Sequence, residues 1–176
     1  MVSGAAPRRR SAEWLRLLFG PRSPESVVDV ALVAVRIALA WVFIYYGSAK
    51  LFGAFPGSGP HGIHETSLYM SHTAHLHPGE LFAVVAGLIE FGGGIAMALG
   101  LFTRLAGFAL VGDMVMAMIT VTWATGIKSS SNPPGYQLNL ALAGLAIAIA
   151  LLGAGRISID ALIARAMGRR QAQPIP

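Results

Sequence analysis

Cysteine is absent from this chain of 176 residues, and charged residues make up only 12% of it. Without a thiol, the chain can form no disulfide, thiolate zinc site, c-type haem attachment or dithiol relay of its own, and we expect neither haem nor an iron–sulfur cluster. The scarcity of charge, together with a hydrophobic content of 55%, excludes an ordinary soluble domain. The composition favours an integral membrane protein.

Long apolar runs cover residues 27–51, 81–102, 105–125 and 136–152. A helix needs about 20 apolar residues to cross a hydrocarbon layer of about 30 Å. A soluble bundle would need polar residues over much of each helix surface, and these runs lack them. We therefore predict an all-α, polytopic membrane four-helix bundle over residues 27–155. A basic interfacial segment precedes it at 1–26, and a cytoplasmic amphipathic helix with a disordered tail follows at 156–176.

The distribution of Lys and Arg predicts the orientation in the membrane. Arginines gather before the first run, between the second and third, and after the fourth, whereas residues 53–79 contain no Lys or Arg. By the positive-inside rule both termini are cytoplasmic and the 53–79 loop is extracytoplasmic. Short amphipathic helices are expected at 11–20 and 158–170, on the membrane surface. Lipid contact thus accounts for the net charge of +5, and nucleic acid is not an expected partner.

Three ionisable residues, Arg36, Glu90 and Asp113, lie deep inside the predicted spans, whereas Asp29 and Lys50 lie near the ends of the first span. Each of the three is about 12 to 14 Å from the end where its span begins, so all three are expected near the middle of the membrane. Such side chains are costly there without a partner or a function. We predict that Arg36 pairs with ionised Glu90 while Asp113 is protonated or open to water, and that Asn139 adds an amide. The alternative is that the cluster only fixes helix register.

Lys50 ends the polar stripe of the first span, near the outer surface and beside aromatic residues such as Tyr46. A cation beneath an aromatic rim can hold the polar head of an amphiphile, such as a quinone carbonyl or a lipid phosphate. A lysine that extends to the membrane surface within an aromatic belt is the alternative interpretation.

All five histidines lie in the outer loop, as His61, His64, His72, His75 and His77. The two HxxH spacings place imidazoles on one face of a helical turn, an arrangement that can bind Zn or Cu. The alternative is a hydrated loop whose imidazoles lie among lipid headgroups. Residues 66–75 are predicted to form a short interfacial helix that covers the mouth of the bundle.

Three segments, RIALAWVFIYYGSAKLFG, AGLIEFGGGIAMALGLFTRLAG and LNLALAGLAIAIALLGAGRISID, together resemble the DoxX family of small bacterial membrane proteins. The family-like positions are Arg36, Gly47, Lys50, Glu90, Gly93, Gly94, Gly100, Thr103, Arg104, Asn139, Gly153, Gly155, Ser158 and Asp160. The resemblance implies a four-helix protein of the bacterial cytoplasmic membrane. It also implies links to quinone-dependent oxidation, as in the membrane subunit of thiosulfate:quinone oxidoreductase, or to stress complexes with thiol enzymes. The histidine loop and Asp113 depart from the family pattern.

The leading hypothesis is a quinone-linked accessory subunit that works with a partner oxidoreductase. Its interior would bind a quinone headgroup or pass protons through Arg36, Glu90 and Asp113. The alternative is a non-redox protein that binds or transports a lipid, a small amphiphile or a metal ion through the histidine loop. The sequence contains no independent catalytic motif. The small residues of the second span can pack within one bundle or between copies of the chain, so a homo-oligomer is an alternative to a monomer.

Overall fold

The computed structural model describes residues 24–55, 59–128 and 135–171, and within these ranges all regular structure is helical. The α-helices are α2 (Glu25–Phe52), α3 (Gly62–His72), α4 (Gly79–Leu99), α5 (Thr103–Ala117), α6 (Gln137–Leu152) and α7 (Ile159–Gln171). The all-α prediction is confirmed for these residues. The amphipathic helix predicted at 11–20 and the tail at 172–176 lie outside the described ranges.

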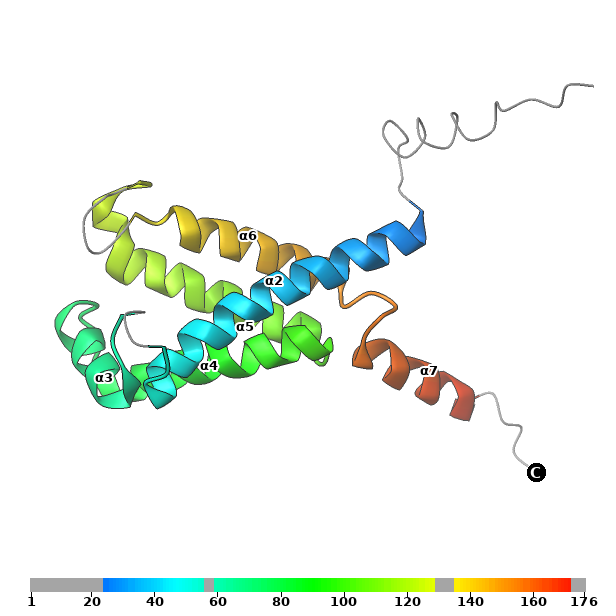
Figure 1. Ribbon diagram of the computed structural model, residues 1–176, viewed down its shortest axis with the longest axis horizontal. Helices are drawn as coiled ribbons and strands as arrows, with labels where there is room; N and C mark the ends of the chain where they lie inside the picture. The colour runs from blue at the N-terminus through cyan, green and yellow to red at the C-terminus, as the bar shows by residue number, and fades with distance from the viewer. Residues whose placement is uncertain (1–23, 56–58, 129–134, 172–176) are drawn as a thin grey trace, which may run out of the picture.

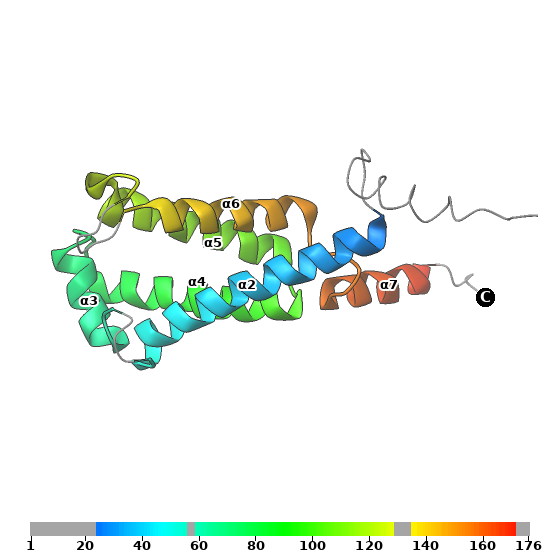
Figure 2. The same ribbon diagram turned by 45° about the horizontal axis from the view of Figure 1, so that its top comes forward.

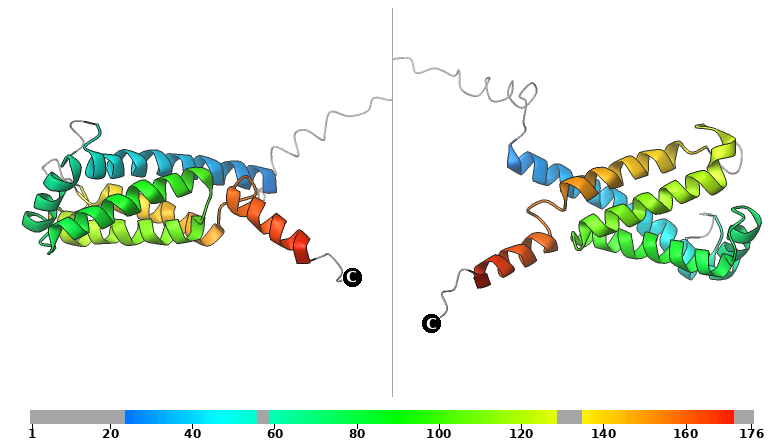
Figure 3. Two further views of the ribbon diagram at one scale, coloured as in Figure 1. Left: turned by 90° about the horizontal axis from the view of Figure 1, so that it is seen from below. Right: turned by 180° about the vertical axis from the view of Figure 1, so that it is seen from behind.

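Four helices run along the length of the molecule, with α2 packed against α4 and α5 packed against α6 (Figure 1). Contacts between α4 and α5 join the two pairs. The short helix α3 lies across one end, and α7 projects from the other, as Figure 2 and Figure 3 show. We refer to these two ends as the α3 end and the α7 end.

Glycines let α2 and α4 approach closely. A Cβ atom at Gly47 would lie 2.3 Å from the backbone nitrogen of Phe91, and one at Gly94 would lie 2.9 Å from that of Ile44. These paired contacts run in opposite directions along the two helices, so α2 and α4 are antiparallel. Close backbone packing of this kind is typical of helix pairs in membranes. The hydrophobic effect does not drive association there, and small residues let the backbones approach closely enough for van der Waals contact.

The outer surface of the long helices is apolar. Trp41 is 78% exposed and Leu105 is 71% exposed, whereas Leu39 and Leu110 in the interior are 0% exposed. Such a surface suits hydrocarbon rather than water. Within residues 24–55, 59–128 and 135–171, three helices are long and apolar enough to cross a membrane: Glu25–Phe52, Gly79–Leu99 and the continuous stretch Thr103–Thr125. The fourth predicted run is confirmed as a helix but has only 16 residues.

The helix that begins as α5 changes its geometry before it ends. After Ala117 it continues as a π-helix, η1 (Met118–Thr122), and then as a 3-10 turn, η2 (Trp123–Thr125). We had expected one uninterrupted helix over 105–125. Four consecutive β-branched residues occupy 119–122, and their stiff side chains crowd an α-helical turn. A π-helical turn is rare and often marks a functional site.

A short helix in the 53–79 loop is confirmed, although it covers Gly62–His72 rather than 66–75. Its first turn is stabilised by Glu65, whose carboxylate accepts a 2.9 Å hydrogen bond from the N–H of His61. α3 packs mainly on α4 and also contacts α2, and Thr66 is its fully buried residue. The helix therefore covers the end of this pair, as predicted for a lid.

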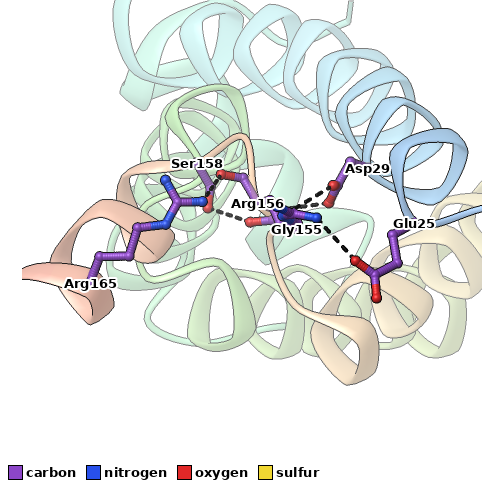
Figure 4. Close-up of polar contacts among 6 residues, drawn as sticks. All are labelled: Glu25, Asp29, Gly155, Arg156, Ser158 and Arg165. Atoms are coloured by element: carbon purple, nitrogen blue, oxygen red, sulfur yellow. Dashed lines mark hydrogen bonds and ion pairs between the residues drawn. The ribbon is translucent and has the colours of Figure 1, made fainter. Parts of the chain in front are cut away.

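Polar contacts hold α2 to the loop before α7 (Figure 4). The carboxylate of Asp29 accepts a 2.8 Å hydrogen bond from the N–H of Arg156, and the Arg156 guanidinium forms a 3.0 Å ion pair with Glu25. The Ser158 hydroxyl donates to the carbonyl oxygen of Gly155 at 2.7 Å. The loop is thus ordered by its own turn and by α2.

Asp160 ties the start of α7 to the start of α5. Its two carboxylate oxygens accept hydrogen bonds of 2.8 and 3.0 Å from the N–H groups of Phe102 and Thr103. Partial burial alone would raise the pKa of Asp160, but the hydrogen bonds from Thr103 and Phe102 and the charge of Arg36 together lower it below its usual value. An ionised carboxylate here also complements the positive end of α5.

Candidate functional site

A buried ion pair connects α2 to α4. The Nζ atom of Lys50 lies 2.5 Å from Oε2 of Glu90, and the Glu90 side chain is only 4% exposed. The pair forms at the level where Gly47 contacts the backbone of Phe91, so close helix packing brings the two side chains within reach. Pairing offsets part of the cost of burying each charge in an apolar interior.

Asp113 joins this pair from α5. The side chain of Leu110 lies against Gly93 of α4. Glu90 precedes Gly93 by three residues, and Asp113 follows Leu110 by three. Because α4 and α5 are antiparallel, both residues lie on the same side of this contact and at one level along the helix axes. Their carboxyl groups are close enough to interact electrostatically, and Lys50 acts on Asp113 as well. One ammonium group thus faces two carboxyl groups, whereas the sequence predicted that the cation facing these two acids is Arg36.

A cavity of about 900 Å³ contains this cluster. Its walls are mostly apolar, and they come from α2, α3, α4, α5, η1 and α6. The lining residues are Tyr46, Lys50, Gly59, Pro60, Thr66, Tyr69, Met70, Leu76, Phe82, Val85, Ala86, Ile89, Glu90, Ala109, Gly112, Asp113, Met116, Ala117, Thr120, Val121, Thr122 and Asn139. An apolar cavity of this size with a few convergent polar groups is typical of small-molecule sites.

Asn139 reaches the cavity from α6, as the sequence predicted for an amide in the interior. Its Nδ2 atom lies 4.0 Å from the sulfur of Met114, which is a weak acceptor, so the amide keeps capacity for a ligand. Among the predicted interior residues, the structure therefore places Lys50, Glu90, Asp113 and Asn139 around one cavity.

The predicted pairing of Arg36 with Glu90 is wrong. Arg36 is buried, but its guanidinium donates to backbone carbonyl oxygens at the α7 end instead of to a carboxylate. The acceptors are Met97 at 2.9 Å, Ala98 at 3.3 Å, Ala154 at 2.6 Å and Ile157 at 2.9 Å. Arg36 therefore joins the end of α4 to the loop before α7 and lies outside the cavity lining.

The error lies in the axial position of Arg36, since its helical face was predicted correctly. Arg36, Phe43 and Gly47 are all buried on one stripe of α2. However, α2 has 28 residues and extends beyond α4 at the α7 end, so Arg36 lies beside the last turn of α4. A cation is favourable there because the helix ends in unpaired carbonyl groups. Lys50 lies correspondingly deeper than predicted, at the level of Glu90.

The five histidines lie before, on and after α3, and none of them lines the cavity. Within the described ranges, no three His, Cys, Asp or Glu side chains converge so that they could hold a metal ion. Glu65, which follows His64, accepts a hydrogen bond from the backbone N–H of His61. Binding of Zn or Cu by the histidines stays a prediction.

Several lining residues were not identified from the sequence. Thr66 of α3 and Thr122 of η1 belong to the cavity, although neither of them was predicted as a site residue. A signal was present at 120–122, where two threonines interrupt an apolar span. Polar residues within a membrane span tend to face the protein interior.

Taken together, the fold and cavity define a multi-pass helical membrane protein with a polar cluster in an apolar interior. Residues 31–123 match the model of the DoxX family. The chain is 30% identical to the inner membrane protein YqjF of Escherichia coli K12 over 137 residues, which are 77% of this chain and 93% of YqjF. The chain belongs to the DoxX family.

Two further relatives support the same conclusion. The inner membrane protein YphA of Escherichia coli K12 is 30% identical over 140 residues, covering 74% of this chain and 89% of YphA. A protein of Haemophilus influenzae is 33% identical over 130 residues, covering 73% of this chain and 87% of the relative. No solved structure matches the chain. The names of the two Escherichia coli relatives and the apolar helices establish a multi-pass protein of the bacterial membrane.

Proposed function

We propose that this protein is a quinone-linked accessory subunit whose cavity binds a quinone headgroup. The observation that carries the proposal is the Lys50–Glu90 ion pair beside Asp113, in the wall of an apolar cavity of about 900 Å³. The cavity volume falls within the range of ligand sites, roughly 300 to 1,000 Å³, and its apolar walls suit a ring with an isoprenoid tail. The cavity residues therefore fit a quinone with its isoprenoid tail.

The roles of the polar residues follow from their chemistry. The ammonium of Lys50 and the amide of Asn139 are the donors for a ring carbonyl oxygen. A bound quinone supplies two-electron chemistry coupled to two protons, with the electrons delivered by a partner oxidoreductase, since the chain has no thiol. Glu90 and Asp113 hold protons next to this position. If both were ionised against Lys50 alone, one negative charge would remain uncompensated, so we propose that one of them carries a proton.

The proposed membrane arrangement follows from the charges at the two ends. Arg104, Arg156 and Arg165 lie at the α7 end, and the 53–79 loop at the α3 end contains no Lys or Arg. By the positive-inside rule, the α7 end and both termini are cytoplasmic, and α6 completes a four-helix bundle as the fourth span. The cavity then lies toward the extracytoplasmic side.

Extraction of the purified protein tests the quinone proposal. The protein is prepared in mild detergent without an added histidine tag, and quinones, lipids and metals are quantified by mass spectrometry in wild type and Glu90→Gln. We expect near-stoichiometric quinone that falls at least about tenfold in Glu90→Gln, because charge-assisted contacts in the cavity are lost. Glu80→Gln, an exposed carboxylate on the same helix, is the matched control and keeps the quinone. Wild-type protein without quinone would contradict the proposal.

A second candidate is a non-redox protein that binds or transports a lipid or another small amphiphile. It is favoured by cavity-lining residues that are also exposed on the flank of the molecule, Val85 at 43% and Met116 at 46%. If these helices span the membrane, that flank faces hydrocarbon. In the same extraction, bound lipid without quinone selects this candidate, and zinc or copper near one per chain selects the histidine loop.

A further inference from the structure

Two buried hydroxyl groups in the cavity have no hydrogen-bond partner among the residues that the structure describes. Thr66 of α3 is 0% exposed and Thr122 of η1 is 5% exposed, and the Oγ1 atom of each lacks a partner. Both residues line the cavity. A buried hydroxyl is normally paired, with protein or with ordered water, because an unpaired one loses its hydration without compensation. These two atoms therefore indicate a polar occupant.

The two hydroxyls lie on the extended part of the cavity toward the α3 end. Thr122 is nine residues beyond Asp113 along the same helix, which corresponds to about 13 Å. Thr66 comes from α3, which covers that end. The polar cluster of Lys50, Glu90 and Asp113 and the hydroxyl pair are thus separate polar zones of one cavity.

The cavity also reaches the surface at the α3 end. Gly59 and Pro60, in the segment that precedes α3, belong to its lining, and Gly59 is exposed. Tyr46 and Tyr69 contribute further hydroxyl-bearing side chains to the cavity lining. The cavity that opens at this surface therefore also contains Asp113 and Glu90 and has several polar side chains in its walls. No charged side chain other than Lys50, Glu90 and Asp113 lines the cavity in the described residues.

We propose that Thr66 and Thr122 hold water molecules that carry protons between the α3 end and the carboxyl groups of Asp113 and Glu90. Each hydroxyl both donates and accepts a hydrogen bond, so it can bind a water molecule and link it to the next member of a hydrogen-bonded row. A polar cavity with several partners is the setting in which buried water is stable. The inference rests on the proposed role of the carboxyl pair, but it does not require that the ligand be a quinone.

Hydrogen–deuterium exchange at the carboxyl groups tests this path. The infrared C=O band of a protonated carboxyl shifts when its proton is replaced by deuterium. The band is assigned by its loss in Asp113→Asn or Glu90→Gln, and its exchange after a change to D₂O is timed in ligand-free protein. Thr66→Val and Thr122→Val keep the side-chain shape and remove the hydroxyl. We expect each to slow the exchange about fivefold or more, the effect of one lost net hydrogen bond.

Thr73→Val is the control, because Thr73 is exposed at the end of α3 and does not line the cavity. This variant should leave the exchange rate unchanged. Thermal unfolding provides a second readout. Thr66→Val and Thr122→Val remove a hydroxyl that has no partner among the described residues, so the melting temperature should not fall. Loss of a hydroxyl with a structural role would lower the melting temperature.

Equal exchange rates in wild type, Thr66→Val and Thr122→Val would overturn the water path, and so would the absence of any protonated carboxyl band assignable to Asp113 or Glu90. Neither result depends on the extraction experiment. Slow exchange in the valine variants of a protein that retains no quinone would support the path and contradict the quinone proposal.

Discussion

At the scale of single residues, Arg36 and Lys50 lie on the same inward face of α2 but have different kinds of partner. Lys50 pairs with the carboxylate of Glu90 in the cavity, whereas Arg36 donates only to backbone carbonyl groups. The planar guanidinium has five donors and can serve several carbonyl oxygens at once. Arg36 is therefore assigned to the assembly of the fold, and Lys50 to the candidate site.

This assignment predicts the outcome of Arg36→Lys. A lysine has fewer donors and no fork geometry, so we expect the loss of one or two hydrogen bonds to a charged group. The melting temperature in detergent should fall by roughly 5 to 10 °C, given about 2 to 4 °C per kcal/mol for a chain of this size. Ligand retained per folded molecule should not change, since Arg36 does not line the cavity.

Arg165→Lys is the control, because the exposed Arg165 makes a single hydrogen bond of 3.4 Å to the Arg156 carbonyl oxygen. Its melting temperature should equal that of the wild type. An Arg36→Lys protein that melts normally but loses its ligand would contradict the assignment and return Arg36 to the site.

At the scale of helices, the sequence predicted which segments are helical and which faces point inward, but it did not predict how far each helix is shifted along its neighbours. The face follows from the 3.6-residue period, which the stripe of Arg36, Phe43 and Gly47 obeys. The shift depends on particular backbone contacts such as Gly47 with Phe91, which no single helix encodes. The prediction for Arg36 failed for this reason. Glu90 and Asp113 were grouped correctly because only residues 100–102 separate the end of α4 from the start of α5, and so short a turn fixes the axial register of the two helices.

The π-helical turn and the two buried threonines were likewise outside the reach of periodicity. An extra residue in one helical turn changes which of the following side chains face the interior. Whether such a turn forms depends on tertiary packing, which the sequence period does not report. Thr122 is consequently buried, while Trp123 next to it is 63% exposed and stacks on Tyr136.

Gly47→Ala tests the helix contact that positions the ion pair. The added Cβ would lie 2.3 Å from the backbone nitrogen of Phe91, and neither backbone can move without separating α2 from α4. We expect destabilisation of about 1 to 3 kcal/mol, the usual cost of overpacking, measured as a lower melting temperature. Gly92→Ala on α4 is the control, because no atom lies within 4 Å of its Cβ position. Equal melting temperatures for the two variants would show that the helices are not in close contact at Gly47.

At the scale of the whole molecule, the proposed topology requires the two ends to lie on opposite sides of the membrane. The natural absence of cysteine makes this directly testable, because each introduced cysteine is the only thiol. We expect a membrane-impermeant maleimide to label Thr73→Cys and Lys128→Cys in intact spheroplasts. Arg104→Cys and Arg165→Cys should react only after lysis. These four residues are exposed and lie at alternate ends of successive long helices.

The cysteine-free wild type is the control for non-specific labelling. Labelling of Arg165→Cys from outside, with the other three sites as expected, would mean that α6 does not cross the membrane. Reversal at all four sites would instead invert the orientation and place the cavity toward the cytoplasm.

The contacts of Arg36 also determine how the molecule can deform. At the α7 end α2, α4 and the loop before α7 meet at one guanidinium, and Asp160 adds the start of α5, so this end is a stiff joint. At the α3 end the same helices flank the cavity. α4, with 21 residues, then acts as a lever arm of about 30 Å. A rotation of α4 by about 5° about this joint would displace its far end by about 2.6 Å, comparable to the diameter of a water molecule.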